Sequence, residues 1–162
     1  MKKLLGAGLA VVLMGSFAPS SDAFVRLPYS GRGYSWYCPY ASHHWGTSRM
    51  IYKIKAIANK WKDWGCPGNI KSGDISKQYG GYFSPHATHR YGKDADFQPM
   101  TKYGGGQTYV GAYNYSRYYT QKFVYAMRAT SYSIRVIYFN DSRVSYVRYA
   151  SGHHNHLHLS IY

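Results

Sequence analysis

The chain has 162 residues, 20 of them lysine or arginine and six of them acidic, and its formal net charge is +14 at pH 7. All six acidic residues are aspartates, so any chemistry that needs a glutamate is excluded. A charge of this size attracts polyanions. The basic residues are scattered and form no nucleic-acid-binding motif, so we expect no nucleic acid partner and favour anionic envelope polymers. A basic surface without a dedicated partner explains the charge equally well.

The first 23 residues have the pattern of a secretory signal peptide. Two lysines open the chain, an apolar stretch covers residues 4–17, and small residues precede a cleavage position after Ala23. The apolar stretch is short for a membrane span, although an anchoring helix is the alternative. We expect a periplasmic or secreted protein without a transmembrane anchor, and a single domain over residues 24–162.

The two cysteines, Cys38 and Cys66, are an even pair in a chain that is expected to be exported. Such a pair is first interpreted as a disulfide. Zinc ligation by the pair is the weaker alternative, because no second Cys or His pair is spaced to complete a structural site.

The predicted elements begin with an irregular arm over residues 24–46, which is rich in Gly, Pro, Ser and Tyr. A cap at Thr47 or Ser48 and an apolar stripe at helical spacing predict a helix that ends near Gly65. The residues of this stripe are Met50, Ile51, Ile54, Ile57, Ala58, Trp61 and Trp64. Residues 65–93 are predicted to form a loop.

A short strand is expected over 95–97, a flexible glycine loop over 104–106 and a possible strand over 108–113. A second helix is predicted over 116–129. Strands are predicted over 133–139, 144–149 and 155–161. Helices early and strands late indicate an α+β domain, with a small antiparallel sheet flanked by helices and long loops.

Six of the eight histidines lie in two distant segments. Residues 84–96 read SPHATHRYGKDAD, and residues 152–159 read GHHNHLHL. Imidazole and carboxylate are usual ligands of zinc, and neither segment holds a full ligand set. The two segments therefore suggest one site that folding assembles on the sheet.

Alternation along the last predicted strand places His154, His156 and His158 on one face. In the earlier segment, His89 and Asp96 are seven residues apart and would face opposite ways on a straight strand. A turn at Gly92 allows them to converge on one ion. Asp94 is then an outer-shell partner.

The absence of glutamate limits the mechanism. Zinc peptidases of the His-Glu-x-x-His type are excluded. In a zinc hydrolase built from this chain, the base is a histidine or an aspartate. A histidine with an ordinary pKa of ~6.5 is able to take up and return a proton at neutral pH.

The two motifs together resemble the penicillin-insensitive murein endopeptidases, within the wider lysostaphin, D-Ala-D-Ala metallopeptidase and hedgehog group. The run GDIS at 73–76 with the glycines at 80–81, and VIYFN at 136–140, extend the resemblance over about residues 44–161. The chain is shorter than the family members to which we compare it and has fewer cysteines.

The resemblance implies one Zn²⁺ ion bound by His89, Asp96 and His158. His156 corresponds to the general base or oxyanion stabiliser, and His153 to a further active-site histidine. His86 corresponds to a histidine at the rim. His154 has no counterpart, although strand alternation allows it to replace His153.

The expected activity is hydrolysis of peptide cross-links in peptidoglycan, with the D-alanyl–meso-diaminopimelyl bond as the favoured target. A D,D-carboxypeptidase or D-Ala-D-Ala dipeptidase acting on uncross-linked stems is the alternative. A wall-binding protein without activity and a secreted basic nuclease are the remaining alternatives. The nuclease is suggested only by the string His-His-Asn-His, without a surrounding ββα-metal pattern.

Overall fold

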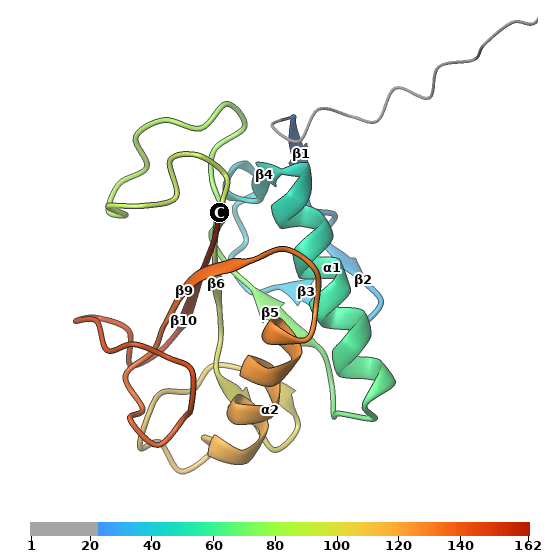
Figure 1. Ribbon diagram of the computed structural model, residues 1–162, viewed down its shortest axis with the longest axis vertical. Coiled ribbons are helices and arrows are strands. Elements are labelled where there is room, and N and C mark those ends of the chain that lie inside the picture. Colours follow the sequence, from blue (N-terminus) through green and yellow to red (C-terminus); the bar gives the residue numbers. More distant parts are fainter. Residues whose placement is uncertain (1–22) are drawn as a thin grey trace, which may run out of the picture.

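The computed structural model describes residues 23–162. The predicted signal peptide, apart from Ala23, lies outside these residues. Within the described part of the chain, no helix has the length and apolar character needed to cross a membrane. Two helices pack beside a twisted sheet with long loops (Figure 1), so the α+β prediction is confirmed.

Both predicted helices are present. Helix α1 covers Ser48–Asp63, and the side chain of Thr47 accepts a hydrogen bond from the backbone N–H of Met50 at its start. Helix α2 covers Arg117–Arg128 and is capped in the same way by Ser116. These caps satisfy backbone N–H groups that the first helical turn leaves free.

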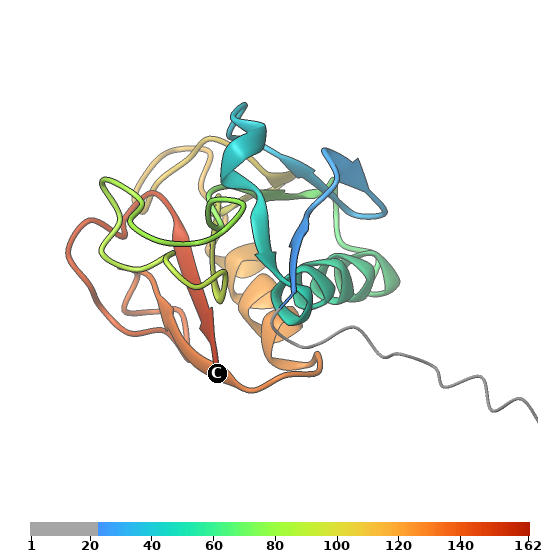
Figure 2. The same ribbon diagram turned by 90° about the horizontal axis from the view of Figure 1, so that it is seen from above.

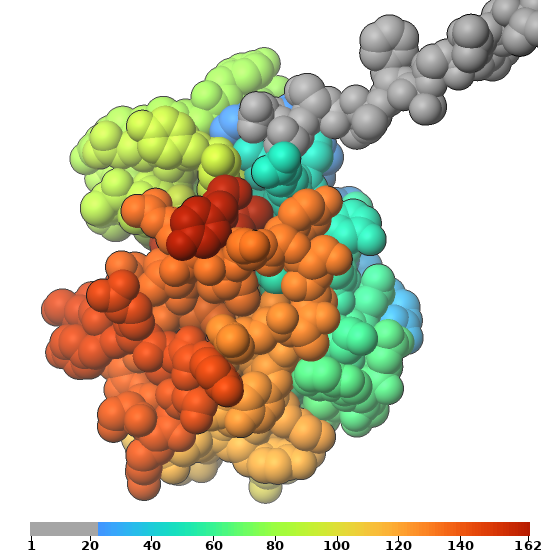
Figure 3. Space-filling view, in the orientation of Figure 1, coloured from blue at the N-terminus to red at the C-terminus, as the bar shows by residue number. Residues whose placement is uncertain are grey.

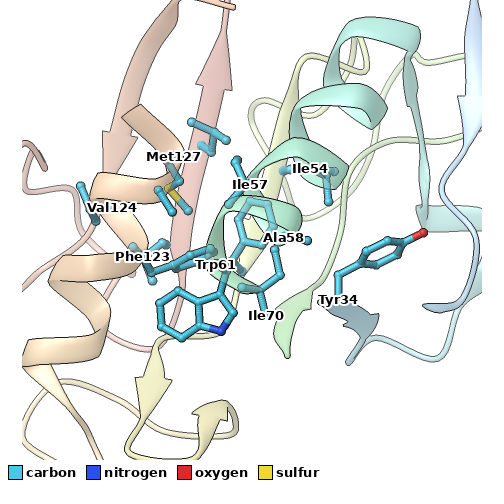
Figure 4. Close-up of a cluster of buried hydrophobic side chains, with 14 of the residues drawn as sticks. Tyr34, Ile54, Ile57, Ala58, Trp61, Ile70, Phe123, Val124 and Met127 are labelled. Carbon is cyan, nitrogen blue, oxygen red and sulfur yellow. The ribbon is translucent and has the colours of Figure 1, made fainter. Parts of the chain in front are cut away.

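The apolar stripes of the two helices form the centre of the core. The indole of Trp61 on α1 is fully buried, and its ring meets Phe123 of α2 edge-on, at 6.0 Å between centroids. Figure 4 shows these rings between the two helices, with Ile57 and Met127 beside them. The centre of the core therefore lies between the apolar faces of α1 and α2.

The main sheet has six strands in the order β2-β3-β5-β6-β10-β9. In that order the strands cover Ser30–Gly31, Tyr34–Trp36, Ile70–Ser72, Asp94–Phe97, Leu157–Ile161 and Ile134–Tyr138. The pair β3–β5 is parallel and the other pairs are antiparallel. The sheet is therefore mixed, where the sequence predicted an antiparallel one.

Two small two-stranded sheets complete the fold. Strand β1 (Phe24–Arg26) pairs with β4 (Trp45–Thr47), and β7 (Met100–Thr101) pairs with β8 (Gly104–Gly105). A short 3-10 helix, η1, covers Ala41–His43. The arm over 24–46 is thus less irregular than predicted, because its short strands pair with one another and, through β3, with β5.

The strands β6 and β10 position the site. In their antiparallel register, Asp96 lies opposite His158, and Leu159 lies opposite Ala95. Leu157 and Leu159 are fully buried, as the alternation predicted. The long β5–β6 loop lies beside β10 in both ribbon views (Figures 1 and 2). In the space-filling view this loop and the β9–β10 connection project as two lobes with the C-terminal end between them (Figure 3).

Several predicted boundaries are wrong. Strand β5 lies inside the predicted loop 65–93, and β8 lies inside the predicted glycine loop. Residues 108–113 do not form the predicted strand, and the chain turns from residue 110. The N–H of Val110 donates a hydrogen bond to the carbonyl of His154 rather than to a neighbouring strand. Residues 144–146 also turn, because Asp141 accepts hydrogen bonds from the N–H groups of both Arg143 and Val144. Of the predicted strand 144–149, Arg148 does pair, in an isolated bridge with Tyr138 of β9.

The predicted disulfide is not formed. Cys38 and Cys66 are both free thiols, and their sulfur atoms contact different parts of the fold. Cys66 is buried beyond the end of α1, with its sulfur 3.9 Å from the carbonyl of Trp64. The Cys38 sulfur lies 3.8 Å from Nδ1 of His43. Each thiol thus has its own environment.

Candidate metal centre

Three buried side chains converge at the middle of the β6–β10 pair. Nε2 of His89 lies 3.1 Å from Nδ1 of His158. Oδ1 of Asp96 lies 3.3 Å from the first nitrogen and 3.0 Å from the second. All three side chains are at most 5% exposed. The structure therefore brings together the three residues that the resemblance named as metal ligands.

The positions of these side chains follow from the local backbone. Asp96 and His158 are a cross-strand pair, whereas His89 comes from the β5–β6 loop with φ 61°. Gly92 also has positive φ, at 63°, and a Cβ there would lie 2.8 Å from the backbone nitrogen of Thr47. The bend and the positive φ at Gly92 confirm the predicted turn, and the clash explains why this position needs a glycine.

A second layer of contacts orients the two imidazoles. Nδ1 of His89 donates a hydrogen bond to the carbonyl of Ile75 at 2.8 Å, which leaves the lone pair of Nε2 free. One oxygen of Asp94 accepts the backbone N–H of His89 at 3.1 Å, and the other lies 3.3 Å from Nε2 of His158. Such partners fix the tautomer and ring orientation of metal-binding histidines.

The electrostatics of the cluster favour bound positive charge. Burial lowers the pKa of His158, but the hydrogen bonds and charges of Asp94 and Asp96 outweigh it and raise this pKa to about 9. Burial raises the pKa of Asp96, but hydrogen bonds to His158 and His89 outweigh it and hold the pKa below its usual range. The buried carboxylates of Asp94 and Asp96 thus favour the protonated form of His158. A bound divalent cation would take the place of that proton.

His156 and His153 lie beside this cluster. The His153 ring is 4.7 Å from the His156 ring and 5.8 Å from the His158 ring. Nδ1 of His153 donates to the carbonyl of Ser151 at 3.0 Å, and Nδ1 of His156 contacts Oδ1 of Asn155 at 2.8 Å. Burial lowers the pKa of His156 below its ordinary value. A neutral His156 is able to accept a proton at neutral pH.

His86 lies closer to the cluster than the predicted rim position. Its ring is 4.4 Å from the His89 ring, and its Nδ1 is 3.9 Å from Oδ2 of Asp96. Its Nε2 contacts Oδ2 of Asp74 at 2.9 Å, and this hydrogen bond raises the pKa of His86. His86, His89 and Asp96 also offer ligand atoms within 4.8 Å of one another, which is compatible with a bound metal.

His154 lies outside the cluster, contrary to the strand-based alternative. Strand β10 begins at Leu157, so the alternation of a strand does not extend back to His154. The His154 side chain is exposed, and its ring lies 6.5 Å from that of Tyr109. His153 therefore remains the near neighbour of His156.

The sequence reasoning missed two residues near the cluster, Asp74 and Tyr37. Burial and the charges of Asp96 and Asp74 raise the pKa of the Tyr37 hydroxyl. Tyr37 and His156 line one cavity of about 370 Å³; the other lining residues are Gln98, Gln107, Thr108 and Asn155. Asp74 lies in the GDIS run at 73–76, which is the sequence signal for it, whereas no sequence pattern marks Tyr37.

Comparison with models of known protein families identifies a relationship over most of the chain. A family model described as penicillin-insensitive murein endopeptidase matches residues 19–128. The match includes His86, His89 and Asp96 and ends before the second histidine segment, so it is shorter at its C-terminal end than the predicted resemblance. No curated protein matches the chain.

Proposed function

Because the chain belongs to the penicillin-insensitive murein endopeptidase family, we propose that it is an exported, zinc-dependent peptidase of peptidoglycan. The proposed substrate is the cross-linked stem peptide, and the proposed bond is D-alanyl–meso-diaminopimelyl. We further propose that residues 1–23 are a signal peptide, and that residues 24–162 act as one domain in the periplasm or outside the cell.

The observation that carries this proposal is the triangle of donor atoms from His89, Asp96 and His158. Its sides are 3.1, 3.3 and 3.0 Å. Zinc–nitrogen and zinc–oxygen bonds of ~2.1 Å in a tetrahedral site separate the ligand atoms by roughly 3.4 Å. The three atoms thus have the spacing of one face of a zinc tetrahedron. Three protein ligands leave a fourth position open, as in catalytic zinc sites.

When bound, zinc supplies a water of lowered pKa and polarises the scissile carbonyl. The remaining chemistry belongs to the protein. We assign His156 to proton transfer, since burial lowers its pKa and keeps it neutral at pH 7. His156 takes a proton from the attacking water and returns it to the leaving amine. We assign an assisting role to His153, whose ring centroid lies 4.7 Å from that of His156 and whose Nδ1 is held by the carbonyl of Ser151.

Substrate access is supported by the cavity that Tyr37 and His156 share, with a volume of about 370 Å³. Its lining also includes two glutamines, which offer both donors and acceptors to a peptide backbone. Peptidoglycan stem peptides carry carboxylates. Without Lys2, Lys3 and Asp22 the net charge of +14 becomes 14 − 2 + 1 = +13 for residues 24–162, and this charge favours the approach of the stem peptides and of other anionic envelope polymers.

Digestion of purified sacculi tests the proposal. The mature protein is incubated with sacculi, either with added zinc or after treatment with a chelator, and the muropeptides are identified by mass. We expect cross-linked dimers to disappear only with metal. Release of free D-alanine identifies a carboxypeptidase, and an unchanged muropeptide profile with zinc contradicts the proposed enzyme. Cleavage of plasmid DNA identifies the nuclease.

A further inference from the structure

A second group of ligand-type side chains lies on the other side of His86. Cys38, His43 and Asp74 each offer one atom, and these atoms lie within 4.8 Å of one another. Nδ1 of His43 is 2.9 Å from Oδ1 of Asp74 and 3.8 Å from the sulfur of Cys38. His43 ends η1, Cys38 follows β3, and Asp74 follows β5. The arm over 24–46 thus meets the loop that carries His89.

The geometry of this group differs from that of a Cys-His-Asp catalytic triad. In a triad, one ring nitrogen faces the nucleophile and the other faces the acid. Here the thiol and the carboxylate both approach Nδ1 of His43. One nitrogen is unable to donate its proton to Asp74 and also act as the base for Cys38. Three donor atoms within 4.8 Å of one another are instead compatible with a ligand set.

We propose that Cys38, His43 and Asp74 bind a second divalent metal ion of the zinc type. In a tetrahedral zinc site, the sulfur and nitrogen ligands are roughly 3.5 Å apart, and nitrogen and oxygen ligands roughly 3.4 Å. The separations of 3.8 and 2.9 Å need only small side-chain shifts to match. A thiolate favours zinc over the hard cations Mg²⁺ and Ca²⁺.

Access and charge are consistent with binding. The side chains of His43 and Asp74 are 27% and 22% exposed, so solvent reaches the group. Burial and the neighbouring Asp74 raise the pKa of the Cys38 thiol to about 11, so a bound ion would have to displace its proton. The resulting thiolate and the carboxylate would then supply two negative charges that neutralise a divalent ion. His43 also packs edge-on against Phe83 at 4.7 Å, which restrains the imidazole.

The second ion would stabilise the first site through Asp74. The carbonyl of Asp74 accepts the backbone N–H of Asp96 at 2.9 Å, and the next residue, Ile75, holds Nδ1 of His89. Oδ2 of Asp74 contacts His86 at 2.9 Å. An ion on Oδ1 fixes the carboxylate and the backbone on which both ligands depend. Occupancy of the second site should therefore raise the metal affinity of the first.

Cobalt substitution tests this site directly, because a Co²⁺–thiolate bond gives a near-ultraviolet charge-transfer absorption and a site of imidazole and carboxylate does not. The reduced protein, comprising residues 24–162, is stripped of metal and titrated with Co²⁺. The bound metal per chain is then measured after dialysis. We expect the absorption and two ions in the parent protein, and one ion without the absorption in Cys38→Ala. The matched control is Cys66→Ala, which keeps both signals because Cys66 lies at the end of α1.

The proposal stands apart from the proposed function, and the variants separate the two. Asp96→Ala should lose one ion and keep the thiolate absorption. If the parent protein binds one ion without that absorption, the second site is overturned while the peptidase proposal stands. If Cys38→Ala and the parent bind equal metal, the site is overturned as well. If His43→Ala loses the absorption while its circular dichroism is unchanged, a folding defect is excluded as the cause.

Discussion

The carboxylate of Asp94 contacts both proposed histidine ligands, although these come from segments 69 residues apart. Its Oδ2 accepts a hydrogen bond from the backbone N–H of His89 at 3.1 Å, and its Oδ1 lies 3.3 Å from Nε2 of His158. Strand β6 therefore supplies a proposed ligand, Asp96, and also the residue that orients the other two. Asp94 acts as a positioning residue.

Replacement of Asp94 by Asn should weaken metal binding at the first site. The amide keeps an acceptor for the His89 N–H and removes the negative charge near His158. Loss of such an outer partner lowers metal affinity by about 10–100-fold. Competition with a chromophoric chelator in a Cys38→Ala background measures this affinity. The control is Asp63→Asn, which alters an exposed carboxylate paired with Arg32. Equal affinities in both variants would contradict the assigned role.

Replacement of His156 by Ala should slow hydrolysis without releasing metal. General acid–base catalysis contributes about 10²–10⁴-fold to a rate, and we expect kcat to fall within this range. Turnover of a cross-linked muropeptide dimer and metal content are measured on the same sample. His154→Ala is the matched control, since this exposed histidine lies two residues earlier and outside the cluster. An unchanged kcat in His156→Ala contradicts its role in proton transfer.

His44 should make the fold acid-sensitive. Its ring stacks on Trp36 at 3.7 Å, and its Nε2 donates to the carbonyl of Cys38 at 3.0 Å. Within the described residues, its buried Nδ1 has no hydrogen-bond partner. Burial lowers the pKa of His44 to about 4, since a second proton on Nδ1 would place an unpaired charge in the core.

The sign of this effect follows from proton linkage. Between the unfolded pKa of about 6.5 and the folded pKa of about 4, the unfolded chain binds more protons than the folded one. The free energy of unfolding should therefore fall as the pH decreases through this window, by up to roughly 3 kcal/mol. Urea unfolding of the metal-free protein measures it. His44→Phe keeps an aromatic ring and should remove this part of the pH dependence; identical pH profiles would contradict the account.

Thr47 links the start of α1 to the loop of the site. Its hydroxyl oxygen accepts the N–H of Met50 at 3.3 Å, and the hydroxyl donates to the carbonyl of Gly92 at 3.2 Å. Thr47→Ala should lower the free energy of unfolding by about 1–2 kcal/mol, because a cap and a buried hydrogen bond are lost. Thr47→Ser keeps the hydroxyl and should retain most of the stability. Equal losses in the two variants in thermal unfolding would rule out this explanation.

The helices and the central strand pair were predictable because each has a complete local signal. Helix α1 has a cap and an apolar stripe with a 3.6-residue period, and Leu157 and Leu159 alternate correctly along β10. The strands of the arm were missed because two or three residues carry too little periodicity. Pairing partners elsewhere in the chain decide such strands, as in β3 with β5.

The candidate site was predictable in its residues and less so in its geometry. The turn at Gly92 and the convergence of His89 with Asp96 followed from spacing, since only glycine suits the left-handed backbone there. His156 and His153 were assigned through the resemblance. Strand alternation alone would have selected His154, because it assumed a strand where the chain still turns. Asp74 and Cys38 become neighbours only through tertiary packing.

The most direct test of the central claim is cleavage of a purified, cross-linked muropeptide dimer of known structure. The zinc-loaded protein should convert it into two monomers with the addition of one water, and the new amino group should lie on the diaminopimelyl side chain. Asp96→Ala and the chelated protein should leave the dimer intact. Hydrolysis that proceeds equally without metal, or release of terminal D-alanine from an intact cross-link, would contradict a zinc-dependent endopeptidase.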